Sequence, residues 1–279
     1  MTSGNRPRSV TTGWILLGLF AISTGIATVF PSAALAGNIV VLAFCLVHGA
    51  QRYGWRAILA ALAIIFIIAM VLENISIVTG FPFGHFRHSE VMGPKLLHVP
   101  YAVPLFYFTL SYPAWAVANL LLNEADRDGK PLSTIGLPLV AMFIPSAIDG
   151  TLDPIAATLN HSWTWPSGGG YFGVPLSNFL GIMAVHAIAF FAFALILTRN
   201  SGLVRAGQSP GWWAQPAVLM LIFSIVPAIA MAVQPDRTAI DPAGVAWRAR
   251  DIYEGLTVFS LLGPFLLGLT ALLVALRGR

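Results

Sequence analysis

The chain has 279 residues, of which 57% are hydrophobic and 9% charged, with a formal net charge of +4 and a mean hydropathy of +0.79. A soluble domain carries about a quarter charged residues, so this composition predicts an integral membrane protein. The basic residues are spread over loops and tails without an aromatic-interleaved patch, which argues against nucleic acid as a partner. The single cysteine, Cys45, excludes an internal disulfide and any CxxC motif.

Eight apolar segments follow one another along the chain, and several approach the ~20 residues that cross a bilayer core. We expect an all-α transmembrane bundle of about eight spans, forming one integral-membrane domain over 1–279. The segments are 13–31, 38–51, 57–79, 99–122, 135–157, 174–198, 213–234 and 252–276. The second is short, and tilted, re-entrant and extended forms all remain open for it. Connectors rich in Gly, Pro and charge separate the segments, as expected at helix ends.

The distribution of Lys and Arg predicts the orientation of these spans. With the N-terminus inside, the inner segments hold ten basic residues: Arg6, Arg8, Arg52, Arg56, Arg127, Lys130, Arg199, Arg205, Arg277 and Arg279. The outer segments hold five: Arg87, Lys95, Arg237, Arg248 and Arg250. The positive-inside rule therefore predicts a multi-pass protein of the cell membrane with both termini in the cytoplasm.

The N-terminal segment leaves an alternative open. Its basic start, its apolar run and the triplet Ala34-Leu35-Ala36 resemble the three regions of a secretory signal. We favour an uncleaved first helix. Cleavage would leave seven spans, with the rest of the chain in the same orientation.

The connector Glu73–Pro100 places prolines, glycines and three histidines between two spans. Irregular backbone is costly at the edge of a bilayer unless it lines a cavity or packs on protein. The predicted topology puts this connector on the same outer face as the loops 160–173 and 235–251. We therefore expect a site that opens in the outer half of the bilayer.

Three carboxylates are the leading catalytic candidates, because ionisable groups within spans are expensive and usually functional. Asp149 and Asp153 are four residues apart, so a helix places them on one face. Two carboxylates so close repel each other, which keeps a proton on one of them and makes it a plausible acid. Glu73 follows the apolar run IIFIIAMVL. In the structural alternative, Asp153 caps backbone near Pro154 and Asp149 bonds a neighbouring helix.

The histidines invite a metal interpretation, since His85 and His88 are three residues apart and His98 and His161 fall on the same side. A lone HxxH in a loop is weak evidence for a metal, and the repeated histidine clusters of membrane di-iron oxygenases are absent. We therefore expect no metal, and assign His85 and His88 to orienting hydrogen bonds or interfacial placement.

Aromatic residues cluster in the loop after the fifth apolar segment, with Trp163, Trp165 and Tyr171 the principal ones. An interfacial aromatic belt explains them. They are equally suited to line a pocket whose π-faces hold a polyene or stabilise a cation. Asn178, just inside the next helix, is placed to hold a water molecule or another polar group.

A family resemblance joins these segments. The chain contains E-N-x-x-x-x-T-G-F-P-F-G-H-F from Glu73, M-G-P-K-L, D-x-x-x-D-P, W-x-W and G-G-Y-F-G-V-P-L-S-N-F-L-G. These motifs resemble the CruF-type carotenoid biosynthesis proteins, integral-membrane carotenoid 1,2-hydratases of the bisanhydrobacterioruberin hydratase and γ-carotene 1′-hydroxylase type. The resemblance covers about residues 60–185. This chain has His85-Phe86-Arg87-His88 where the family has tyrosine-containing aromatic residues, which bears on substrate preference.

The resemblance implies addition of water across the terminal double bond of an acyclic ψ-end carotenoid, such as lycopene or a bacterioruberin precursor. The product is a tertiary alcohol, and the reaction needs no cofactor. Its hard step is protonation of an unactivated alkene, which requires a positioned acid and protection of the cation. The expected catalytic residues are Asp149, Asp153 and Glu73. The residues expected to position substrate or water are Phe83, His85, His88, Trp163, Trp165, Tyr171 and Asn178.

Two other functions remain open. One is a non-catalytic carotenoid- or lipid-binding membrane protein, and the other is a proton-coupled transporter that uses the buried carboxylates as a relay. A transporter would carry polar residues through both leaflets, whereas the sequence gathers them on one side. The expected partners are an acyclic carotenoid, water, the bilayer and other enzymes of the carotenoid pathway.

Overall fold

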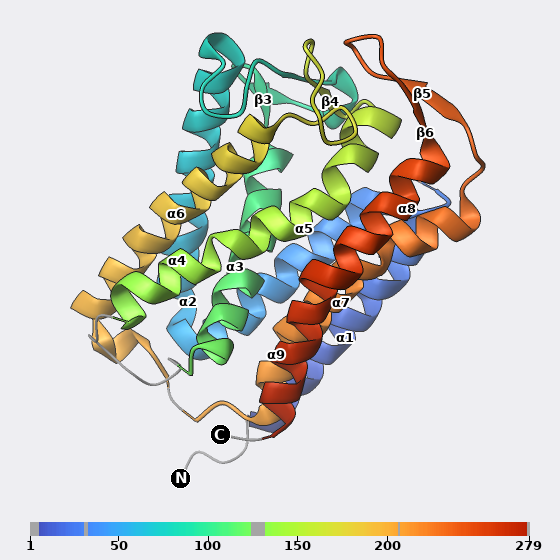
Figure 1. The fold of residues 1–279 in the computed structure, drawn as a ribbon. Helices are drawn as coiled ribbons and strands as arrows, with labels where there is room; N and C mark the ends of the chain where they lie inside the picture. The colour runs from blue at the N-terminus through green and yellow to red at the C-terminus, as the bar shows by residue number, and fades with distance from the viewer. Residues whose placement is uncertain (1–5, 31–32, 124–131, 206, 278–279) are drawn as a thin grey trace.

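A computed structural model describes residues 6–30, 33–123, 132–205 and 207–277, and over these residues the protein is a bundle of helices (Figure 1). The principal helices are α1 (Arg6–Ala27), α2 (Ala34–Thr79), α3 (Ala102–Leu121), α4 (Leu137–Ala141), α5 (Phe143–Pro154), α6 (Leu176–Arg199), α7 (Pro210–Val233), α8 (Ala249–Ser260) and α9 (Leu266–Leu276). Short π-helical segments at Leu132–Gly136, Ile155–Leu159 and Leu261–Phe265 continue these helices. Single 3-10 turns occupy Glu90–Met92 and Ser201–Leu203. The all-α prediction is confirmed.

Helix α2 is two helices joined at a kink. Gly54 has φ 74° and ψ 161°, a conformation that side-chain-bearing residues rarely adopt, and it interrupts the 46-residue helix. The chain turns back there, so that Ala34 and Glu73, near opposite ends of α2, line the same cavity. The expected segments 38–51 and 57–79 are therefore the two arms of α2. The short second segment is a full helical arm that begins at Ala34.

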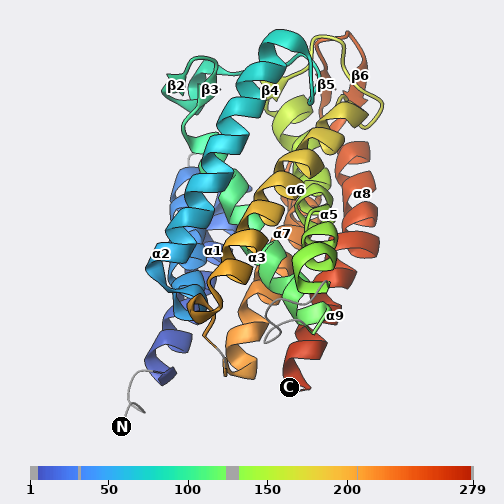
Figure 2. The same ribbon diagram turned by 90° about the vertical axis from the view of Figure 1, so that its left-hand side faces the viewer.

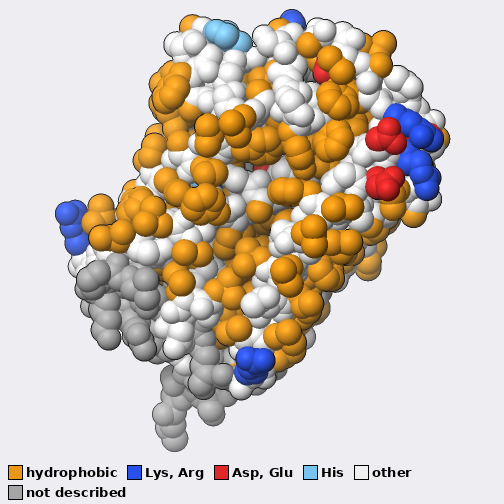
Figure 3. Space-filling model, viewed as in Figure 1, with side chains coloured by type: hydrophobic (Ala, Val, Ile, Leu, Met, Phe, Trp, Pro, Cys, Tyr) orange, Lys and Arg blue, Asp and Glu red, His pale blue; other side chains and the backbone are white. Residues whose placement is uncertain are grey.

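Within the described residues, six helical segments are long and apolar enough to cross a membrane, which indicates a multi-pass membrane protein. Hydrophobic side chains cover much of the face of the bundle that Figure 3 draws. The difference from the eight expected segments has two causes. The arms of α2 count once, and α3, which contains tyrosines, Ser111 and Asn119, falls outside the six. Helix α3 is buried along most of its length and runs through the middle of the bundle. Eight crossings thus remain a prediction.

The two ends of the bundle differ (Figures 1 and 2). Helix α1 begins and α9 ends at one end, which we call the terminal end. Three two-stranded antiparallel sheets lie at the opposite end, the loop end, with strands β1 (Arg87–His88), β2 (Lys95–Leu96), β3 (Val99–Pro100), β4 (Trp163–Thr164), β5 (Thr238–Ile240) and β6 (Ala246–Arg248). The pairs are β1–β4, β2–β3 and β5–β6. The three polar connectors thus lie together. Arg127, Lys130 and Arg279, which the orientation count included, lie outside the described residues.

A buried polar cluster also lies toward the terminal end, opposite the polar connectors. His48 bonds the Tyr112 hydroxyl and the Trp212 carbonyl, and its ring stacks on Trp212 with centroids 3.9 Å apart. The Arg52 guanidinium lies 4.9 Å from the Trp213 ring centroid, a cation–π geometry. These contacts tie α2, α3 and α7 together, which gives the cluster a structural role.

Candidate active site

The connector after α2 is held against the bundle by hydrogen bonds to its backbone groups. Helix α2 ends at Gly80, whose φ of 82° suits the left-handed C-cap conformation. The Ser76 hydroxyl then accepts the Phe83 N–H and donates to the Gly84 carbonyl, each over 2.9 Å. Trp165 Nε1 donates to the Phe83 carbonyl over 3.0 Å, so the connector and the loop 160–175 share a contact.

Strands β1 and β4 join the same two segments a second time. In the antiparallel pair, Arg87 lies opposite Thr164 and His88 opposite Trp163. The Ser89 N–H donates to the Ser162 carbonyl over 2.8 Å. The connector and the loop 160–173, which the sequence places on the same face, are therefore paired, and the pairing register fixes the position of His88.

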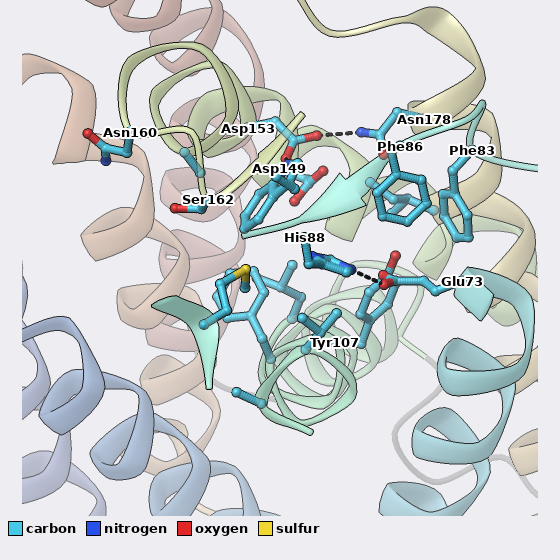
Figure 4. Close-up of a pocket in the computed structure, with 18 of the residues that line it drawn as sticks. Glu73, Phe83, Phe86, His88, Tyr107, Asp149, Asp153, Asn160, Ser162 and Asn178 are labelled. Carbon is cyan, nitrogen blue, oxygen red and sulfur yellow. Dashed lines mark hydrogen bonds and ion pairs between the residues drawn. The ribbon is translucent and has the colours of Figure 1, made fainter. Parts of the chain in front are cut away.

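The walls enclose a cavity of about 350 Å³ at the loop end of the bundle (Figure 4). This size is within the range of small-molecule sites. Its lining consists of Ala34, Asn38, Glu73, Phe83, Phe86, His88, Met92, Ala102, Val103, Phe106, Tyr107, Leu110, Asp149, Asp153, Ala156, Asn160, Ser162, Trp163, Trp165, Asn178, Ile182 and His186. The cavity thus holds three carboxyl groups and two imidazoles, with no Lys or Arg among its described lining residues.

One wall is built on Glu73. His88 Nε2 lies 2.8 Å from Glu73 Oε2, and both side chains are almost fully buried. Tyr107 of α3 also hydrogen-bonds Glu73. Figure 4 shows these three side chains together. The three side chains thus form a polar patch on this wall of the cavity.

The facing wall carries Asp149 and Asp153, which α5 places one turn apart (Figure 4). Asp153 Oδ1 accepts the Trp163 indole N–H over 3.0 Å, and Asp153 Oδ2 accepts the Asn178 amide. The carboxyl groups of Asp149 and Asp153 interact directly with each other. Two buried carboxyls in contact share a proton, since both cannot be ionised there at low cost.

Three polar atoms of the lining residues are buried without a hydrogen-bonding partner among the described residues: Asp149 Oδ2, His88 Nδ1 and His186 Nε2. Leaving such a group unpaired costs about 1–3 kcal/mol. Because the three residues line one cavity, water or a ligand in it can hydrogen-bond these atoms.

The apolar part of the lining is aromatic. Phe86 packs against Phe83, His88 and Trp165, with ring centroids 6.1, 5.1 and 5.9 Å apart. The Trp163 and His88 centroids are 6.3 Å apart. Aromatic faces around buried carboxyls suit a polyene and stabilise positive charge.

A metal centre is not formed by the described residues, in which no group of three or more His, Cys, Asp or Glu side chains is placed to hold an ion. The pair of His85 and His88 is separated, since His88 is buried in the cavity wall whereas His85 is exposed. His85 Nδ1 lies 3.4 Å from the Ile77 carbonyl. His98 and His161 are also exposed and do not line the cavity.

Most of the residues predicted for the site line this cavity together: Glu73, Phe83, His88, Asp149, Asp153, Trp163, Trp165 and Asn178. His85 and Tyr171 do not. The Tyr171 hydroxyl donates over 3.0 Å to the carbonyl of Gly150, which directly follows Asp149 and lies three residues before Asp153 on α5. Burial and the neighbouring Asp153 raise the pKa of Tyr171 to about 12, so this phenol remains a donor. It supports α5 from outside the cavity.

Tyr107 and His186 are lining residues that the sequence analysis missed. Their rings stack with centroids 5.5 Å apart, and His186 Nδ1 donates to the Ile182 carbonyl over 2.8 Å. Both lie within long, mainly apolar helices and outside any of the motifs. Their polarity within an apolar run was the available signal.

Comparison with known proteins agrees with the resemblance seen in the motifs. A bisanhydrobacterioruberin hydratase of Haloarcula japonica is 30% identical over 139 residues, which cover 49% of this chain and 42% of that relative. The chain thus matches less than half the length of this curated relative. No solved structure matches the chain. The family described as "Carotenoid biosynthesis protein" matches residues 29–247. Because this match includes both walls of the cavity and most of the bundle, we conclude that the chain belongs to the carotenoid biosynthesis protein family.

Proposed function

We propose that this protein is a carotenoid hydratase, which adds water across the terminal double bond of an acyclic carotenoid to give a tertiary alcohol. The observation that carries the proposal is the cavity itself, where two carboxyl-bearing walls face each other within an aromatic lining. Hydration needs a proton source, a water site and protection for a cation, and consumes no redox equivalents. Membership of the family and the name of the hydratase relative support this reaction.

Asp149 is the proton donor in this proposal, and Asp153 its charged neighbour. Both oxygens of Asp153 accept hydrogen bonds, from Trp163 and Asn178, which favours the ionised form of that carboxyl. The shared proton then resides on Asp149, whose Oδ2 has no partner. Protonation of the less substituted alkene carbon leaves a tertiary cation, which the rings of Phe86, Trp163 and Trp165 face.

The opposite wall holds the attacking water. Glu73, His88 and Tyr107 form a connected set of hydrogen-bonding groups there. Water that adds to the cation must lose a proton, and this wall supplies the acceptor. We place the cavity in the outer half of the bilayer, with eight crossings and both chain termini in the cytoplasm. The substrate then enters from the membrane.

The test is expression in a host that makes lycopene, followed by mass analysis of the pigments. A hydratase gives pigments heavier than lycopene by the mass of one or two water molecules, whereas a non-catalytic carotenoid-binding protein leaves lycopene unchanged. Asp149→Asn preserves the shape of the side chain but removes the proton donor. This variant should lose the alcohol while still copurifying with pigment. Full activity in both Asp149→Asn and Asp153→Asn would refute the proposed acid.

A further inference from the structure

We infer that His88 is the general base that takes the proton from the attacking water, with Glu73 as its positioning residue; this inference rests on the proposed hydration reaction. The pairing of Nε2 with the Glu73 carboxylate decides which ring nitrogen is free. A carboxylate only accepts hydrogen bonds, so the proton of neutral His88 lies on Nε2, 2.8 Å from Glu73 Oε2. The lone pair is then on Nδ1, which is buried and has no partner.

The backbone around His88 holds the ring in place. Its carbonyl accepts from Lys95 Nζ over 3.0 Å, and the residue is paired with Trp163 across β1–β4. The ring is edge-on to Phe86 with centroids 5.1 Å apart. A base fixed in this way loses little freedom when it accepts a proton.

Glu73 gives His88 an advantage over His186, the other imidazole of the cavity lining with one ring nitrogen that has no partner among the described residues. When a base becomes an imidazolium, an adjacent carboxylate stabilises the new charge, as in the carboxylate–histidine pairs of hydrolases. His88 has such a carboxylate. His186 Nδ1 instead donates to a backbone carbonyl, which carries no full charge. His88 is therefore the better proton acceptor.

The complete step balances. The alkene π electrons take the proton of Asp149, which becomes a carboxylate, and a tertiary cation forms. A water oxygen bonds to the cation, and His88 Nδ1 takes one proton from that water, leaving the neutral tertiary alcohol. The proton then returns from His88 to Asp149 through water, so that acid and base are both restored.

The experiment separates protonation from water capture. Purified enzyme in detergent is given lycopene in deuterium oxide, and both the alcohol and the recovered lycopene are analysed by mass. His88→Gln places an amide N–H where Nε2 was, which preserves a donor to Glu73, but provides no base. We expect the alcohol to fall by about 100-fold or more. Recovered lycopene should still gain deuterium, because the cation formed on proton transfer from Asp149 can return to an alkene by losing a hydrogen other than the deuterium just added.

Two further variants complete the design. His88→Gly should regain alcohol formation when imidazole is added, which a purely structural role would not give. Glu73→Gln should lower alcohol formation while deuterium uptake persists, as expected of a residue that acts through His88. Thermal unfolding of each variant checks that it is folded.

Three outcomes would overturn the inference. His88→Gln could keep wild-type alcohol formation, or lose deuterium uptake together with the alcohol. Alternatively, His186→Gln could lose the alcohol and retain deuterium uptake while His88→Gln has no effect, which would assign the base to His186. None of these contradicts the hydratase itself. That proposal fails separately if wild-type enzyme forms no alcohol and incorporates no deuterium.

Discussion

Trp163 donates its indole N–H to Asp153 over 3.0 Å and thereby fixes the cavity wall that carries the two aspartates to the loop that contains β4. The same residue is paired by its backbone with His88, on the opposite wall. One aromatic residue therefore links the wall that carries Asp149 and Asp153 to the wall that carries Glu73 and His88. This explains why two polar connectors, far apart in sequence, need to meet in a short sheet.

The hydrogen bond from Asn178 to Asp153 should matter for catalysis. Asn178→Leu has a similar volume but donates nothing, so the proton shared by the aspartates becomes less available on Asp149. A hydrogen bond to a charged group is worth about 1.5–3 kcal/mol, which predicts a roughly 10- to 100-fold lower rate of alcohol formation. The measurement is the initial rate with lycopene in detergent.

Ser177→Ala is the matched control, since Ser177 donates to the Phe83 carbonyl over 3.2 Å and contacts neither aspartate. Trp165 still bonds that carbonyl. Equal losses in the two variants would contradict a specific role for Asn178.

The packing of Phe83 on α6 should control the shape of the cavity. A Cβ added at Gly181 would lie 2.4 Å from Phe83 Cδ1, so Gly181→Ala must displace this ring. Overpacking of this kind costs about 1–3 kcal/mol. We expect lower activity and altered pigment retention, and partial rescue when Phe83→Leu is added.

Gly263→Ala provides the comparison, because an added Cβ there has no heavy atom within 4 Å. Activity and melting temperature should be unchanged in that variant. A Gly181→Ala enzyme with wild-type rate and pigment retention would show that Phe83 does not shape the site.

Ser76 should be important for stability because it serves two backbone groups of the connector. Ser76→Ala leaves the Phe83 N–H and the Gly84 carbonyl without this partner. We expect the free energy of unfolding to fall by about 1–3 kcal/mol, measured by thermal or denaturant unfolding in detergent. Thr79→Ala, one turn along the same helix, removes an exposed hydroxyl whose partners, the Ile75 carbonyl and the Phe81 N–H, water can satisfy, so it should change the stability much less. The idea fails if the two substitutions have the same effect.

Asp241 should anchor the third connector at the loop end. Its buried carboxylate accepts the N–H groups of Ala243 and Val245, each over 2.9 Å, and the Trp247 indole over 2.8 Å. Asp241→Ala leaves three donors unpaired and should lower the free energy of unfolding by at least about 2 kcal/mol. Asp236, whose pKa is lowered by its hydrogen bond to Arg248, is exposed. Asp236→Ala should therefore have little effect. An Asp236→Ala protein that is less stable than the Asp241→Ala protein would contradict this role of Asp241.

The sequence predicted the helices and much of the site because both depend on local patterns. Apolar runs give the helices, and a spacing of four places Asp149 beside Asp153. The contact between connector and loop depends instead on long-range pairing, which no local pattern encodes. The inclusion of His88 and exclusion of His85 follow from strand register at β1. Tyr107 and His186 lie on apolar helices, and only the packing of the bundle shows which face of each helix points inward.

The buried polar cluster around His48 was missed for a related reason. Its members lie far apart in the sequence, on α2, α3 and α7. Only the assembled bundle shows that they satisfy one another.

The central claim is that the oxygen of the product comes from water, and isotope labelling tests it most directly. Purified enzyme is given lycopene in isotopically labelled water under ordinary oxygen, and the product alcohol is analysed by mass. The account predicts that each new hydroxyl carries the label of the water. Hydroxyls that carry label only when molecular oxygen is labelled would contradict hydration and indicate an oxygenase.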